Sequence, residues 1–241
     1  MHKLAVIAVG GLAVSAICLG AAAAIGAREH GGNFDFAMFD DSPDCKAANA
    51  TSTATTRSFP WDGGDKVTIE VPVNLHYKPG TGTTLEAKGD PQMLANLTVK
   101  DGTIEMSCRG GRWHHQRLDI TLPGREFKEY HIAGVADLDL QELNQASLKI
   151  EIAGSGDVTA NGKVDDLKLE IAGRGDAHMK DLAVKTLKLE IAGRGDVETS
   201  PQDNADIDIA GSGNVKLYTE PKHIETSIMG RGDVEHLAGK S

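Results

Sequence analysis

Five polar residues able to hold a cation recur at a nearly constant spacing in the second half of the chain. Each closes a glycine-rich phrase, and the copies read IAGSGD, IAGRGD, IAGRGD, IAGSGN and IMGRGD, starting at residues 152, 171, 191, 209 and 228. The five residues are Asp157, Asp176, Asp196, Asn214 and Asp233. If the copies stack as strands, these side chains form one file at a spacing of about 4.8 Å.

Two interpretations fit such a file. A row of carboxylates can bind Ca²⁺, but the known glycine- and aspartate-rich repeats repeat every nine residues and this chain does not. Alternatively, each aspartate accepts hydrogen bonds from the amides of a tight corner, with its charge offset by the residue two positions earlier. Arginine holds that position at 174, 194 and 231, whereas uncharged Ser212 precedes uncharged Asn214. Ser155 before Asp157 is the one exception, and the co-occurrence at the other corners favours a structural corner ladder and no metal site.

Three of the corners spell Arg-Gly-Asp, at residues 174–176, 194–196 and 231–233. An integrin ligand must project this tripeptide on a loop, whereas here it falls in a tight turn between strands. The recurrence follows from the repeat, so we do not expect an integrin ligand.

The remaining chemistry is sparse. His114 and His115 follow Cys108 among several arginines, but the Cys108-x5-His114 spacing is not that of a zinc site. A solvated basic loop explains these residues better. We therefore predict no catalytic residues and no cofactor.

The elements that position the corners follow from the period. The leading isoleucines of the phrases are 18 to 20 residues apart, and an earlier copy, IAGVADL, starts at residue 132. Leu167, Leu169 and Ile171 alternate with charged residues, which is typical of a strand with one buried face. Gly-x-Gly would supply backbone freedom for the turn. These features predict an all-β fold, a parallel β-helix with coils of about 19 residues and two or three short strands per coil.

The predicted β-helix domain spans residues 59–241. Residues 131–234 hold the regular repeats, and residues 59–130 are expected to form irregular capping coils, because terminal repeats must cover the core. Asp101-Gly102 is a predicted hairpin turn and Pro72 a predicted bend. Aromatic residues make up 4% of the chain, which predicts an aliphatic core. The net charge of −10 argues against nucleic acid as a partner.

The N-terminus predicts export. Lys3 precedes an uncharged apolar stretch over residues 4–25 that ends among small residues, so residues 1–27 form a signal peptide or, alternatively, a retained membrane anchor. Such an anchor would be the only contact with a membrane. Residues 28–58 are predicted to be a flexible tether. Cys45 and Cys108 are expected to form a disulfide in an oxidising compartment, with two free thiols as the alternative.

Four segments together resemble a known family: WDGGD at 61–65, VPVNLHYKPG at 71–80, ITLPGREF at 120–127 and the IAGSGD series. The chain is similar, over residues 59–234, to the family called "Putative auto-transporter adhesin, head GIN domain". The resemblance implies a right-handed β-helix in the bacterial envelope. It carries no catalytic motif and therefore implies no site residues.

Two functions remain. The first is a non-catalytic module of the bacterial periplasm or cell envelope that presents its β-helix surface to an unknown envelope or surface partner. The second is a carbohydrate-active enzyme for an acidic polysaccharide, which needs paired carboxylates in a groove walled by loops. The coil spacing leaves no room for such loops between residues 132 and 234, which favours the first function.

Overall fold

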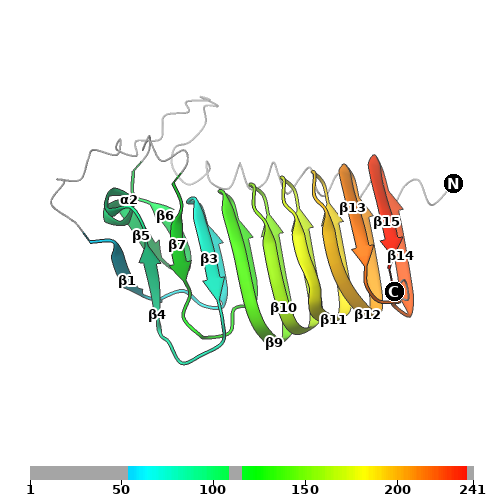
Figure 1. Ribbon diagram of the computed structural model, residues 1–241, viewed down its shortest axis with the longest axis horizontal. Helices are drawn as coiled ribbons and strands as arrows, with labels where there is room; N and C mark the ends of the chain where they lie inside the picture. Colours follow the sequence, from blue (N-terminus) through cyan, green and yellow to red (C-terminus); the bar gives the residue numbers. More distant parts are fainter. Residues whose placement is uncertain (1–53, 109–115, 238–241) are drawn as a thin grey trace, which may run out of the picture. The chain divides into compact units, whose positions relative to one another are not determined.

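The computed structural model describes residues 54–108 and 116–237. Strands dominate the fold, and successive coils lie side by side from β9 to β15 (Figure 1). The elements are β1 (Thr56–Pro60), β2 (Lys66–Ile69), β3 (Val73–Tyr77), β4 (Thr84–Lys88), α2 (Pro91–Asn96), β5 (Leu97–Lys100), β6 (Thr103–Met106), β7 (Leu118–Thr121), β8 (Glu129–Ile132), β9 (Ala136–Ile152), β10 (Val158–Ile171), β11 (Ala177–Ile191), β12 (Val197–Ile209), β13 (Ser212–Leu217), β14 (His223–Ile228) and β15 (Arg231–His236).

The predicted parallel β-helix is confirmed. Strands β9 to β12 pair in parallel with their neighbours in sequence, and each bends through a whole coil instead of splitting into two or three short strands. Strand β12 shows the two faces of a coil: its first residues pair with β13 and its last residues with β14. The corner phrase joins the end of one coil to the start of the next.

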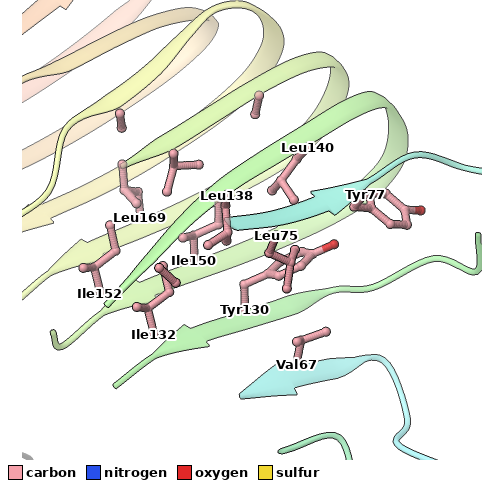
Figure 2. Packing of buried hydrophobic residues seen from close by; sticks show 14 of the residues in the cluster. Val67, Leu75, Tyr77, Tyr130, Ile132, Leu138, Leu140, Ile150, Ile152 and Leu169 are labelled. Atoms are coloured by element: carbon pink, nitrogen blue, oxygen red, sulfur yellow. The ribbon is translucent and has the colours of Figure 1, made fainter. Parts of the chain in front are cut away.

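One file of the core consists entirely of isoleucine. Each leading isoleucine of a corner phrase lies in register with the next, and the file continues through two earlier strands. In stacking order the residues are Ile104, Ile69, Ile132, Ile152, Ile171, Ile191, Ile209 and Ile228. All are buried except the last, which is 42% exposed. Figure 2 shows Ile132 and Ile152 pointing into the interior beside Ile150 and Leu169.

The first coils are stacked out of sequence order. Strand β2 pairs on one side with β6 and on the other with β8, and β3 likewise lies between β7 and β9. The coil formed by β6 and β7 is therefore the outer one, although it comes later in the chain. The intervening β4 and β5 pair antiparallel with β7 and β6, and β1 pairs antiparallel with β4.

Residues 59–130 thus contain two coils and an antiparallel covering. The predicted turn at Asp101-Gly102 joins β5 to β6 with positive φ at both residues, +49° and +80°.

The short helix α2 is capped at its N-terminus by Asp90, whose carboxylate accepts the amide N–H groups of Gln92 and Met93. The sequence pattern did not predict α2. Residues 56–58, assigned to the tether, belong to β1, where Arg57 lies over the Phe59 ring and binds the Leu94 carbonyl at 2.8 Å.

The core is aliphatic in the repeats, as predicted, but it contains aromatic residues in the first coils. Phe127 makes edge contacts with Trp61 and Tyr77 at 5.2 and 5.6 Å between ring centroids, and Tyr130 lies 6.1 Å away. Figure 2 shows Tyr77 and Tyr130 next to each other. Burial raises the pKa of the Tyr130 hydroxyl well above its ordinary value. These rings pack against one another in the part of the core that belongs to the irregular first coils.

The stacked lysines of the repeats form ion pairs with glutamates of their own strands. Lys149, Lys168 and Lys188 are stacked directly on one another, and each pairs with the glutamate two residues along its own strand. Lys149 also reaches Glu170 of the next coil, at 3.7 Å. The diagonal pairing expected from like charges in register is therefore present.

Replacing Ile171 with alanine should lower the free energy of unfolding by about 2–5 kcal/mol, because the cavity lies between two coils. Lys168→Ala is the matched surface control and should cost less than about 1 kcal/mol. Denaturant unfolding measures both. Hydrogen exchange should accelerate in the neighbouring coils around Ile152 and Ile191, because each coil is stabilised by its neighbours. Unchanged protection there would contradict the stacked-coil interpretation.

Candidate functional site: the glycine corner

The corner phrases form a continuous edge of the β-helix. The residue after the first glycine of each phrase pairs in parallel with its counterpart in the next coil, in the order Val135, Ser155, Arg174, Arg194 and Ser212. Backbone hydrogen bonds cross every step; the Arg174 N–H, for example, donates to the Gly154 carbonyl at 3.1 Å. The corner is consequently as regular as the strands on either side.

Close stacking, rather than backbone freedom, requires glycine at these corners. A Cβ on Gly173 would lie 1.9 Å from the carbonyl oxygen of Gly154, and one on Gly175 would lie 2.2 Å from that of Gly156. The same clash with the preceding coil recurs at every copy, whereas only Gly230 among these corner glycines has a positive φ. The expected role of glycine in a strained turn is thus wrong for most copies.

The five predicted ladder residues do lie in one file. The backbone N–H groups of the first four residues each donate to the carboxylate of the coil before, as from Asp176 to Asp157 at 3.1 Å and from Asp196 to Asp176 at 2.8 Å. Asn214 continues the pattern, donating through its backbone and side-chain N–H groups to Asp196. Asp233 lies in the last coil and accepts the Val234 N–H at 3.0 Å. These hydrogen bonds supply the amide contacts predicted for corner aspartates; that the ladder is structural and binds no cation stays a prediction.

The ladder extends further than the sequence analysis recognised. Asp157 donates its N–H to Asp137, which lies in register with Asn74, and Asn74 in turn donates to Asp119 at 2.9 Å. Arg117 ion-pairs with Asp137 and hydrogen-bonds Asn74. The degenerate copy IAGVADL contains Asp137 and was the available signal; Asn74 and Asp119 have no such phrase.

The expected pairing of each corner arginine with its own aspartate is wrong. Within residues 54–108 and 116–237, Arg174 and Arg194 form no ion pair, and both side chains are exposed. One carboxylate oxygen of Asp176 is instead held by the amide of the next coil. The buried Gly175 separates the two side chains along the chain.

A shallow groove of about 520 Å³ runs along this edge over four coils. Its lining residues are Gly154, Ser155, Gly173, Arg174, Gly193, Arg194, Gly211 and Ser212. A smaller hollow of about 240 Å³ lies beside Asp196, Asn214 and Lys216. There Lys216 hydrogen-bonds Glu198 at 3.2 Å, which lowers the pKa of Glu198 and raises that of Lys216.

The described coils and cap contain no candidate cluster of metal ligands. No group of three or more His, Cys, Asp or Glu side chains converges there. Along the file, the carboxylates of Asp137, Asp157, Asp176 and Asp196 each accept a backbone N–H of the next coil. Ca²⁺ would need six or more oxygens around one centre.

The Arg-Gly-Asp tripeptides lie within the paired edge. Gly175 is buried, and its N–H donates to the Arg194 carbonyl of the next coil at 3.1 Å. The tripeptide is therefore held on both sides by neighbouring coils and does not form a projecting loop.

Several predicted features fall outside the described residues. Residues 1–27, most of the tether, Cys45, His114 and His115 are among them. Cys108 is buried and disulfide-bonded, and its pairing with Cys45 remains a prediction. No helix in the described part of the chain is long and apolar enough to cross a membrane.

Comparisons with known proteins agree with this architecture. Residues 65–221 match the family model described as "Putative auto-transporter adhesin, head GIN domain". A solved structure from Bacteroides fragilis, titled a putative adhesin, is 19% identical with a TM-score of 0.54, covering 75% of this chain and 95% of that one. One from Parabacteroides merdae, with a similar title, is 18% identical with a TM-score of 0.38, covering 75% and 95%. No curated protein matches the chain.

Gly173→Ala should destabilise the chain by about 3 kcal/mol or more, because its Cβ would meet backbone that cannot move aside. Gly64→Ala is the matched control, since nothing lies within 4 Å of a Cβ there. It should change stability by no more than about 1 kcal/mol. Denaturant midpoints measure both, and equal effects would contradict the close-stacking interpretation.

Asp176→Ala removes an acceptor and should cost about 1 kcal/mol, whereas Asp176→Asn keeps an oxygen and should cost less. Thermal unfolding with and without Ca²⁺ separates the two interpretations of the ladder. We expect Ca²⁺ to leave the melting temperature of all three proteins unchanged. A rise in the wild-type protein that is lost in Asp176→Asn would establish cation binding instead.

Proposed function

Because this chain belongs to the head GIN-domain adhesin family, we propose that it is an exported, non-catalytic module of the bacterial cell envelope that binds a partner through its β-helix surface. The family and the solved neighbour from Bacteroides fragilis are named as adhesins and not as enzymes. The apolar N-terminal stretch over residues 4–25 supports export.

One observation carries the proposal: in the repeats, the outer surface consists of regular coils without inserted loops. The corner phrases that join strands β9 to β12 recur every 18 to 20 residues, and the exposed side chains next to them, such as Lys149, Lys168 and Lys188, form straight files. Straight files suit adhesion to an extended partner. An enzyme instead surrounds its substrate with a walled cleft that excludes water.

The carboxylates do not favour the enzymatic alternative. A glycosidase needs two carboxyl groups free to exchange protons with the substrate. Here Asp157, Asp176 and Asp196 each accept a backbone N–H of the next coil, which ties them to the fold.

Cell fractionation and surface labelling of the source bacterium test the location. The full-length protein should appear in the envelope fraction and react with a membrane-impermeant reagent on intact or osmotically opened cells. Purified full-length protein should also sediment with isolated envelopes while releasing no reducing ends from polygalacturonate or peptidoglycan. A cytoplasmic location would overturn the export proposal, and steady release of sugar ends would establish the enzymatic alternative.

A further inference from the structure

Two files in the described coils place cations directly on one another. One contains Lys149, Lys168 and Lys188, and the other contains Arg174 and Arg194. Like charges at directly opposed positions repel, so each file needs compensation. The lysines have it, since each contacts the glutamate of its own strand, as Lys188 contacts Glu190 at 2.9 Å.

The two arginines lack this compensation. Their backbones form a parallel bridge, and neither guanidinium has an ion-pair or hydrogen-bond partner within residues 54–108 and 116–237. The stacked lysines are paired with glutamates, whereas these two stacked arginines have no partner. Positions that depart from the pattern of interactions in the rest of a fold mark functional sites.

That place is also concave. Arg174 and Arg194 lie at the middle of the 520 Å³ groove, with Ser155 in the coil before them and Ser212 in the coil after. The glycines that line the groove carry no side chains, so the floor is smooth backbone. The groove runs across four coils, along the direction in which the strands stack.

The shape and the charge specify a ligand. A guanidinium binds a carboxylate through two parallel hydrogen bonds. Two arginines whose backbones lie on neighbouring coils, at the strand spacing of about 4.8 Å, suit carboxylates that recur along a linear polymer. The flanking serine hydroxyls can donate to and accept from neutral hydroxyl groups. We propose that this groove binds a linear acidic polysaccharide whose sugars carry carboxylates.

Nucleic acid fits the same surface less well. Binding its phosphates requires many clustered cations, and its bases require aromatic stacking platforms. The groove offers two arginines and no aromatic lining, within a chain of net charge −10. The polysaccharide assignment rests on the proposed adhesive function and names the chemistry of its partner.

Isothermal titration of the full-length protein with a galacturonic acid oligomer tests the site, with a neutral galactose oligomer of equal length as the ligand control. We expect binding of the acidic oligomer alone, weakened by salt. The double variant Arg174→Gln/Arg194→Gln should raise Kd at least about tenfold. Arg174→Lys/Arg194→Lys should restore part of the affinity, because it keeps the charge and loses the fork geometry.

Arg231→Gln is the matched protein control. It changes the same phrase, Gly-Arg-Gly-Asp, but Arg231 does not line the groove, so Kd should stay within about twofold of wild type. No variant should melt below the wild type, since the arginines contribute no ion pair, and Arg174→Gln/Arg194→Gln should melt at or slightly above it because it removes the repulsion between the stacked arginines. An equal loss with Arg231→Gln, or binding of a single-stranded DNA oligomer at equal affinity, would overturn the assignment.

The two proposals fail separately. If no acidic oligomer binds while the protein still sediments with envelopes, the groove assignment is wrong and the adhesive function stands. If the protein proves cytoplasmic but binds the oligomer through Arg174 and Arg194, the groove is real and the proposed location is wrong.

Discussion

The hydrogen-bond register between successive coils is the constraint on which the rest of this structure depends. It passes unbroken through the corner, where each glycine lies too close to the carbonyl of the preceding coil to accept a side chain. Because the register is parallel, the side chains at the corner and in the segments that flank it lie on their counterparts in the next coil, whereas the register shifts midway along the coils, between Thr159 and Gly162 and between Met179 and Ala183. The isoleucine file, the lysine file and the aspartate ladder are all consequences of that single arrangement.

Stacking identical residues in register stabilises the fold where they are apolar and destabilises it where they carry the same charge. Isoleucines gain contacts on both sides, whereas charges need a partner offset along the strand or an amide from the next coil. The effect of losing that partner is visible on the later coils, where Asp206 replaces the stacked lysine. Burial raises the pKa of the Asp208 carboxyl, and the neighbouring carboxylates of Asp206 and Glu190 raise it further. The stacked Arg174 and Arg194 likewise lack an oppositely charged partner, and they line the groove.

The sequence by itself determined the repeats. The alternation of apolar and charged residues specified which face of each strand is buried, and the recurring phrase specified the coil length, the corner and the file of aspartates. These features could be predicted because they are local and are repeated several times, so that each copy confirms the others. The hairpin at Asp101-Gly102 was predictable for a similar reason, since two residues of local turn chemistry specify it.

Only the tertiary structure decided the features that depend on partners distant in sequence. The order of the first coils, with β2 and β3 between β6–β7 and β8–β9, cannot be predicted from local pattern because no phrase marks which coil is outermost. The same holds for Asn74 and Asp119 in the ladder. The sequence suggested that Arg174 neutralises Asp176, but spacing along a chain does not determine which atoms meet. The carboxylate binds an amide of the next coil, and the arginine is left exposed at the groove.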